Sequence, residues 1–337
     1  MVSRGLKAVR QGPLVVRNTT FGRVRAQIVC PIAWARSSSL SNPGAPSAES
    51  VPDRPSRGGA CSYDSIVAAV SSVRLRSGLT LSYAEQGDTH GVALMLLPGP
   101  TDSWRSYQLV LDRLPPSMRA VAVSLRGHGD SDKPMTGYRV EDYALDVVSL
   151  LDALGIERAV LAGHSGSCIV ARRVALDHPE RVAGLVLEAS PTTLRGDAGL
   201  QEFVQSVVSG LEDPISADVV RSFVINTSSD DVTPQFLDQL IEEVLKVPAS
   251  VWKQTFGALG DYDDTADLSH VHAPTLLVWG DIDALVSRDM QDEMVKRIPA
   301  AKLVVYSGAG HTPRWDEPSR FSRDVAAFVT ELLHTSD

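Results

Sequence analysis

One short stretch of the chain joins an apolar run to a cluster of small residues around a hydroxyl group. It reads AVLAGHSGSCIV, residues 159–170, and it holds Ser165 between Gly163 and Gly166. A serine on a sharp strand-to-helix turn is the setting of a nucleophile elbow, which needs small neighbours because the helix starts close to the strand. The pattern Gly-x-Ser-x-Gly ends here in Ser167, a mild departure because serine is also small. Ser165 is therefore a candidate nucleophile.

A serine hydroxyl is a weak nucleophile until a base takes its proton, and that base needs an acid to fix its tautomer. Two later stretches supply such residues: LLVWGDIDALV places Asp283 after an apolar run, and VVYSGAGHTPRWDEP places His311 in a Gly-rich loop. We expect both side chains at the strand ends on the sheet edge that carries Ser165. Glu188, at the end of the run LVLEAS, is the rival for the role of the acid.

The elements that must position these residues alternate along the chain from about Ser71. Buried strands are predicted by the apolar and β-branched runs LTLSYAEQG, VALMLLPG, MRAVAVSL, RAVLAG, RVAGLVLEAS, PTLLVWG and AKLVVYSG. Helical spacing of apolar residues occurs in YALDVVSLLDALG, IVARRVALDHP, DMQDEMVKRI and SRFSRDVAAFVTELL. This alternation predicts an α/β fold with a mostly parallel sheet and helices on both faces.

One long interruption separates two parts of this core. Residues 192–268 show no strand pattern, and QEFVQSVVSGL, TPQFLDQLIEEVLKV and SVWKQTFGAL predict helices instead. We therefore divide the chain into a core of residues 71–191 and 269–337 and a helical cap of residues 192–268 above the strand ends. The acidic run GDYDDTADL has no calcium-loop pattern and is interpreted as a solvated connection from cap to core.

The first 65 residues differ in composition from the rest. Residues 1–48 hold seven basic residues and no acidic residue, whereas residues 49–337 hold 25 basic and 41 acidic residues. The Ser, Pro and Gly content of the first 65 residues predicts disorder. A basic, acid-free leader is typical of an organelle transit peptide, and a solvated tail or a misassigned start codon are the alternatives.

The motifs taken together resemble the α/β-hydrolase fold serine hydrolases of the capped, esterase-like kind. The resemblance rests on LPGPTDSW, LRGHGDSDKP, GHSGS, PTLLVWGDID and GAGHTPRWDEP in this order, and it covers the chain from about Val73 to Leu333. It implies that Ser165 is the nucleophile and His311 the general base and then acid. Through the pattern W-G-x-x-D, it implies that Asp283 rather than Asp281 orients His311.

The same resemblance locates the oxyanion hole and the pocket. Similar enzymes use the amide after the nucleophile, here that of Gly166, and the amide of the residue aligned with Pro100, which has no N–H. A second donor must therefore come from elsewhere, with Thr101 the first candidate, through its backbone or its hydroxyl, and Ser103 the second. The pocket residues that we expect are Gly99, Pro100, His164, Trp252 and Trp315.

A serine nucleophile restricts the chemistry. Epoxide hydrolases and haloalkane dehalogenases of this fold attack with aspartate, because serine would form an inert ether. Ser165 therefore points to acyl transfer through an acyl-enzyme, with a carboxylic ester or lactone of a small, largely apolar compound as the expected substrate. Carbon–carbon bond hydrolysis or cofactor-free perhydrolysis with the same triad is the alternative. A ligand-binding receptor on this fold is the alternative of another class.

Composition and charge restrict the kinds of binding partner that we expect. The 337 residues are 43% hydrophobic and carry a formal charge of −9, which disfavours nucleic acid and anionic membranes. The three cysteines form neither a disulfide framework nor a metal pattern, which suits the cytoplasm, with an organelle as the alternative if the leader is a transit peptide. Two close histidines, His270 and His272, lack a third ligand. We expect no membrane span, no metal, no other cofactor, and a monomer or homodimer.

Overall fold

The computed structural model describes residues 68–228 and 232–334. Within them a single eight-stranded sheet runs in the order β1-β2-β4-β3-β5-β6-β7-β8. β1 pairs with β2, and β2 pairs with β4, in antiparallel orientation. All other neighbouring strands are parallel. The predicted disorder of residues 1–65 lies outside the described residues. The strand bounds are Ala69–Arg74 (β1), Thr80–Gln86 (β2), Val92–Leu97 (β3), Met118–Val123 (β4), Ala159–His164 (β5), Val182–Glu188 (β6), Thr275–Gly280 (β7) and Ala301–Tyr306 (β8).

The central strands are apolar throughout because both faces of the sheet are covered. In β3, Met95 and Leu97 pack into one hydrophobic core while Leu94 and Leu96 pack into the other. Side chains that alternate between two buried faces give a continuous apolar run in the sequence. The predicted α/β architecture, a mostly parallel sheet between helices, is therefore present in the structure.

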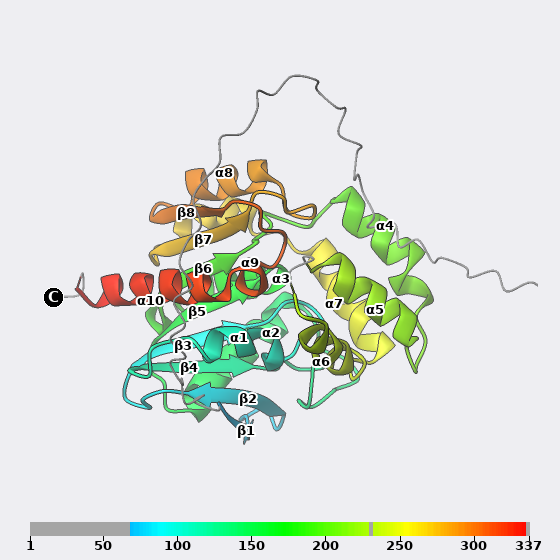
Figure 1. Ribbon diagram of the computed structural model, residues 1–337, viewed down its shortest axis with the longest axis horizontal. Coiled ribbons are helices and arrows are strands. Elements are labelled where there is room, and N and C mark those ends of the chain that lie inside the picture. The colour runs from blue at the N-terminus through cyan, green and yellow to red at the C-terminus, as the bar shows by residue number, and fades with distance from the viewer. Residues whose placement is uncertain (1–67, 229–231, 335–337) are drawn as a thin grey trace, which may run out of the picture.

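Helices form a layer on each face of the sheet (Figure 1). α1 and α10 cover one face, and α2, α3 and α8 contribute buried residues to the core on the other. The helix bounds of the core are Gln108–Leu111 (α1), Val140–Ala153 (α2), Gly166–Asp177 (α3), Arg288–Arg297 (α8), Pro313–Asp316 (α9) and Pro318–His334 (α10), with 3-10 turns at Trp104–Tyr107, Pro179–Arg181 and Thr265–His270.

Four helices fill the interval between β6 and β7, and we call them the cap helices. In Figure 1 they gather to the right of the sheet. Their bounds are Ala198–Ser206 (α4), Ala217–Asn226 (α5), Pro234–Val244 (α6) and Ala249–Asp261 (α7), with a 3-10 turn at Val208–Gly210. The described residues of this interval form helices and no strand, as the sequence pattern predicts.

The sequence patterns did not predict β1, α5, the four-residue helices α1 and α9, or the 3-10 turns. α5 is short and rich in β-branched residues, which weakens its helical signal, but Ser216 caps its first turn and Val220 and Val224 bury one face. β1 is exposed along most of its length, so its sequence AVSSVR carries no apolar run, and its pairing with β2 comes from the backbone ladder.

A buried arginine fastens both ends of the cap to the core. The guanidinium of Arg172, on α3, donates to the carbonyl oxygens of Pro191 and Thr192 at 2.7 and 3.0 Å, where the chain leaves the core. It also binds both carboxylate oxygens of Asp264, at 2.9 and 2.7 Å, where the chain returns. Asp264 is 2% exposed, so the interpretation of the acidic run as a solvated connection was wrong at this residue, which neutralises a buried cation.

None of the helices in residues 68–228 and 232–334 is long and apolar enough to cross a membrane.

The Arg172 clamp predicts a large loss of stability in Asp264→Ala. Removing the carboxylate leaves a fully buried guanidinium without its counter-ion, and we expect the free energy of unfolding to fall by about 3–5 kcal/mol. Asp267→Ala is the matched control, because Asp267 lies exposed in the same 3-10 helix; we expect a change within about 0.5 kcal/mol. Urea unfolding followed by tryptophan fluorescence measures both. Equal midpoints for the two variants would contradict the clamp.

Candidate active site

Ser165 occupies a sharp turn between β5 and α3. Its backbone lies at φ 53° and ψ −126°, in a region that non-glycine residues rarely adopt. Its amide donates to the Glu188 carbonyl oxygen at 2.9 Å, which ties the turn to the end of β6. The turn places the Ser165 side chain in a cavity at the carboxyl edge of the sheet rather than in the sheet or in the helix.

The small residues around Ser165 have steric reasons. A Cβ on Gly163 would lie 2.7 Å from the Ser167 carbonyl oxygen, and a Cβ on Gly166 would lie 2.8 Å from a Leu259 methyl group and 2.9 Å from Pro100. Ser167, the departure from the Gly-x-Ser-x-Gly pattern, uses its hydroxyl to donate to the Pro98 carbonyl oxygen at 2.5 Å. That bond joins the start of α3 to the loop after β3.

His311 and Asp283 meet across two loops. The loop after β8 carries His311, and the loop after β7 carries Asp283, whose carboxylate oxygens lie 2.9 and 3.1 Å from His311 Nδ1. The amides of Leu285 and Val286 donate to Asp283 Oδ1, which fixes the carboxylate. A carboxylate only accepts, so Nδ1 carries a proton, and in the neutral form of the ring Nε2 is the acceptor. This is the tautomer that a general base acting at Nε2 requires.

The rival acids have other partners. Glu188 is fully buried, and both of its carboxylate oxygens bind Arg314, at 2.8 Å from the backbone N–H and 3.0 Å from Nη1. Burial raises the pKa of Glu188, and the Arg314 guanidinium opposes that rise. Asp281 accepts from the Gly308 amide at 2.6 Å. Of the three carboxylates, the structure brings Asp283 to the His311 ring.

A cavity of about 550 Å³ lies between the sheet edge and the cap helices. Its wall includes Ser165 and His311, and the ring of His311 is hydrogen-bonded to Asp283 rather than to Ser165. The bond from nucleophile to base is often loose without substrate and tightens in the complex. Of the other predicted residues, the structure brings to this wall Gly99, Pro100, His164, Gly166 and Trp315.

Trp252 does not line this cavity, so its prediction as a pocket residue was wrong. The side chain is fully buried inside the cap, where its ring packs against Phe223 at 4.8 Å and Phe256 at 5.7 Å between centroids. The aromatic residues of the cap that reach the cavity are Phe203, Phe223 and Phe256. Helical spacing shows that a cap residue is buried, but it does not show whether the residue faces the cavity or the cap interior.

The loop after β3 forms a strained turn beside Ser165. The Asp102 amide donates to the Gly99 carbonyl oxygen at 3.0 Å, with Pro100 second in the turn and Thr101 third at φ 76°. This is the order of a type II turn, whose third position favours glycine. A β-branched residue there is a genuine outlier.

The hydroxyls of the two candidate donors do not line the cavity. Thr101 is 1% exposed, and its Oγ1 has no hydrogen-bond partner among the described residues. The Ser103 Oγ accepts from the Arg105 amide at 3.2 Å and caps a 3-10 turn. Neither residue is among those that line the large cavity, so the structure assigns no second donor, and the Thr101 backbone amide stays a prediction. Gly166 begins α3, where the first amides of a helix have no intrahelical partner.

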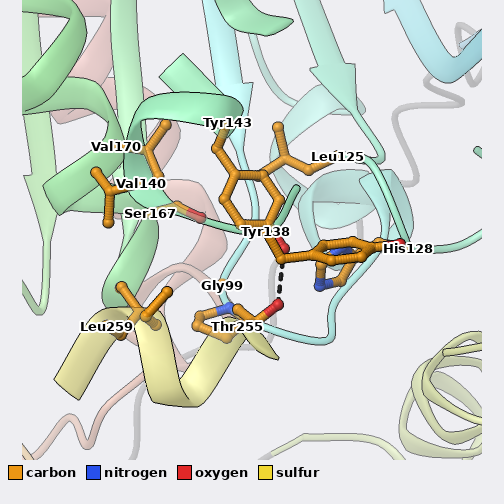
Figure 2. A pocket seen from close by; sticks show the side chains of 13 residues that line it. Gly99, Leu125, His128, Tyr138, Val140, Tyr143, Ser167, Val170, Thr255 and Leu259 are labelled. Carbon is orange, nitrogen blue, oxygen red and sulfur yellow. Dashed lines mark hydrogen bonds between the residues drawn. The ribbon is translucent and has the colours of Figure 1, made fainter. Parts of the chain in front are cut away.

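A second, much smaller cavity is lined in part by Gly99 and Pro100 of the turn after β3 (Figure 2). Its volume of about 20 Å³ has room for one water molecule. The Tyr143 hydroxyl and Thr255 Oγ1 are hydrogen-bonded at 2.7 Å across it, which joins α2 to the cap helix α7. His128 also faces this space, with its Nδ1 2.7 Å from the Arg126 carbonyl oxygen.

Sequence reasoning missed two charged residues of the site. Asp102 lines the large cavity, and its Oδ2 lies 3.3 Å from Nη2 of the fully buried Arg314. Burial raises the pKa of Asp102 to about 6, although the Arg314 guanidinium favours the charged form. Both residues sit in motifs quoted from the sequence, but charged residues in loops are usually solvated, and only the tertiary pairing identifies these as buried.

In the part of the chain that the structure describes, no three side chains of His, Cys, Asp or Glu are grouped so as to hold a metal ion.

Comparisons with known proteins agree with the fold. The family model described as alpha/beta hydrolase fold matches residues 92–318. The chain is similar to a non-heme chloroperoxidase of Streptomyces lividans, with 27% identity over 77% of this chain and 99% of the relative. It is also similar to a 2-hydroxy-6-oxononadienedioate/2-hydroxy-6-oxononatrienedioate hydrolase of Burkholderia vietnamiensis, with 30% identity over 74% and 91% of the two chains. Among solved structures, an esterase from a Rhodococcus species superposes with a TM-score of 0.68 and 26% identity, over 78% of this chain and 99% of that one.

The environment of His128 predicts a pH dependence of stability. Burial lowers the pKa of His128 from 6.5 to about 4, so the unfolded chain binds a proton at this site before the folded chain does. Stability from this residue is complete above pH 6.5 and is lost as the pH falls toward 4, by about 3 kcal/mol. We expect His128→Gln to lose less stability than the parent between pH 7 and pH 4 in urea titrations. Parallel pH profiles of the two proteins would contradict this.

Proposed function

The chain belongs to the alpha/beta hydrolase family, and on that premise we propose that it is a serine hydrolase of carboxylic esters or lactones. The observation that carries the proposal is the position of Ser165 and His311 on one cavity wall, with Asp283 bound to Nδ1 of His311. The residue types, their order in the chain and their place at strand ends agree with acyl transfer.

The proposed reaction begins at the bare Nε2 of His311. This nitrogen takes the Ser165 proton while Oγ attacks the carbonyl carbon of the substrate, and Asp283 stabilises the imidazolium that forms. Collapse of the tetrahedral intermediate breaks the bond to the alcohol oxygen, which receives the proton from His311. A water molecule, deprotonated by His311, then attacks the acyl-enzyme and releases the acid and Ser165.

Two backbone amides are proposed to stabilise the oxyanion, those of Gly166 and Thr101. The Gly166 amide is supported by its place at the start of α3, beside Ser165. For Thr101, the support is the strained φ of 76°, since a backbone outlier costs about 1–3 kcal/mol and persists where the surroundings over-determine it. Strain at this residue is consistent with a functional demand on the direction of its amide.

The shape and lining of the cavity support a small and largely apolar substrate. A volume of about 550 Å³ lies within the usual range for small-molecule sites, roughly 300–1,000 Å³. Much of the wall is apolar, with contributions from Leu194, Leu200, Phe203, Phe223, Phe256, Leu259, Val286 and Trp315.

Carbon–carbon bond hydrolysis is less well supported, although the same triad could perform it. The Burkholderia relative is named for a dioate substrate, which carries two carboxylates. Among the described residues, the wall of the large cavity contains no lysine or arginine to pair with such a group. We therefore place ester or lactone hydrolysis first. A cytoplasmic location is proposed only on the pattern of the three cysteines.

The central test compares the protein with Ser165→Ala on p-nitrophenyl esters of increasing acyl length. We expect Ser165-dependent turnover, and covalent labelling by a fluorophosphonate that is lost in the variant, because the probe reacts with activated serines. Absence of both turnover and labelling in the parent protein would overturn the proposal and favour a ligand-binding receptor.

The identity of the acid is tested by Asp283→Asn. The amide would present the wrong hydrogen-bonding partner to His311 Nδ1, and we expect kcat to fall about 10⁴-fold. Asp281→Asn is the matched control, because it lies two residues away and an amide oxygen can still accept from Gly308. Similar rates in the two variants would exclude Asp283 as the acid.

The oxyanion proposal is tested by Pro100→Ala, which adds an amide at the family's usual donor position. If the Thr101 amide already completes the hole, kcat stays within about threefold of the parent value. An increase of roughly 100-fold would show that the parent lacks a donor, since one donor is worth about that much. Steady-state kinetics on the best p-nitrophenyl ester measures the difference.

A further inference from the structure

The charged side chains on the wall of the catalytic cavity are all acidic. Among the described residues that line it, Asp102, Asp197 and Glu202 are the charged ones apart from the histidines, and no lysine or arginine is present. Asp197 is the N-cap residue of α4 and Glu202 lies in the middle of that helix, on the cap side. Asp102 lies on the core side, beside the turn next to Ser165.

Arg314, the cation that contacts Asp102, also pairs with a second carboxylate. Arg314 is fully buried, and its guanidinium donates to Glu188 at 3.0 Å, to Ser106 Oγ at 3.0 Å and to Asp102 at 3.3 Å. One guanidinium thus faces two carboxylates, so the group carries an excess negative charge when Asp102 is ionised. With the pKa of Asp102 raised to about 6, that is its state at pH 8.

Arg195 does not change this balance. It follows Leu194 of the cavity wall, but its Nε donates to the Asp261 carbonyl oxygen at 2.9 Å, on the outside of the cap. Its side chain is largely exposed, and it is not among the residues that line the cavity.

His164 lines the same wall as Asp102 and adds no positive charge to it. Its Nε2 lies 3.0 Å from the His311 carbonyl oxygen, which can only accept, so Nε2 carries the proton and Nδ1 is bare. Nδ1 is buried and has no hydrogen-bond partner among the described residues. Burial lowers the pKa of His164, so the ring stays neutral. His164 is therefore a neutral residue of this wall, and the Gly99 side of the wall carries the Asp102 carboxylate and no cation.

We propose that this cavity selects substrates by charge, with Asp102 as the specificity-determining residue: uncharged esters enter, and esters that carry a carboxylate are rejected. The inference rests on the proposed ester hydrolysis. A carboxylate in this cavity would lose its hydration without gaining a cationic partner, and it would lie near fixed carboxylates in a medium that screens them poorly.

The experiment uses two esters that differ in one charge. Mono-p-nitrophenyl adipate carries a terminal carboxylate, and its terminal amide is the uncharged isostere. At pH 8 and low salt, after subtraction of the uncatalysed rates, we expect kcat/KM of the parent protein to be roughly 30-fold lower for the carboxylate than for the amide. We define the selectivity ratio as kcat/KM for the amide divided by kcat/KM for the carboxylate. In Asp102→Asn the ratio should fall about tenfold, because the substitution removes the charge and keeps the shape.

A second variant keeps the proposal testable if Asp102→Asn does not fold. Glu202 is exposed on α4, so Glu202→Gln should lower the ratio by about threefold at low salt. At 0.5 M salt, where such charges are screened, the ratio should not change. Glu242→Gln, an exposed position on the cap helix α6 that does not line the cavity, is the matched control and should leave the ratio unchanged.

Equal kcat/KM for the two esters in the parent protein would overturn charge selection while leaving ester hydrolysis standing, provided that turnover is lost in Ser165→Ala. An unchanged ratio in Asp102→Asn, provided that the variant still cleaves the amide ester, would overturn the assignment to Asp102, and an unchanged ratio in both Asp102→Asn and Glu202→Gln would overturn charge selection by this wall. If neither ester is cleaved in a Ser165-dependent way, the proposed function fails and charge selection fails with it.

Discussion

The site depends on strained backbone at the carboxyl edge of the sheet. Three non-glycine residues with positive φ lie there: Thr101 after β3, Ser165 after β5 and Ala189 after β6. Each such residue costs about 1–3 kcal/mol and persists only where its surroundings enforce it. Here the enforcement is visible, because the Ser165 amide binds the Glu188 carbonyl oxygen and the Ala189 amide binds that of Val278. Neighbouring strand ends therefore hold one another in conformations that none would adopt alone.

Buried charge pairs join this edge to the loops around it. Arg314 connects Glu188, at the end of β6, to the loop that carries Asp102. Arg172 connects both ends of the cap to α3. Such pairs are weak evidence for net stability, but breaking one is costly because an unpaired charge remains in the interior. The proposed catalytic residues and the turn at Thr101 therefore lie among segments that buried ion pairs join to one another.

Much of the site could be predicted from the sequence, because the order and spacing of motifs survive without knowledge of packing. Ser165, Asp283 and His311 each follow an apolar run, and strands that are parallel bring their ends to one edge. The sequence did not show which side chains of the cap helices face the cavity. Trp252 is as apolar and as regularly spaced as Phe256, yet Phe256 faces the cavity and Trp252 the cap interior. Asp102 and Asp264 were missed as buried groups, because a carboxylate becomes buried only with a partner, and each partner here is 92 or more residues away in the chain.

The most direct measurement is the capture of the acyl-enzyme. The protein would be mixed with p-nitrophenyl acetate, quenched in acid within the first turnovers, digested, and mapped by mass spectrometry. The account predicts an acetyl group on the peptide that contains Ser165, formed and lost at rates that match turnover. Turnover with no acetyl group at Ser165, or with acetyl on another residue at a competent rate, would contradict it.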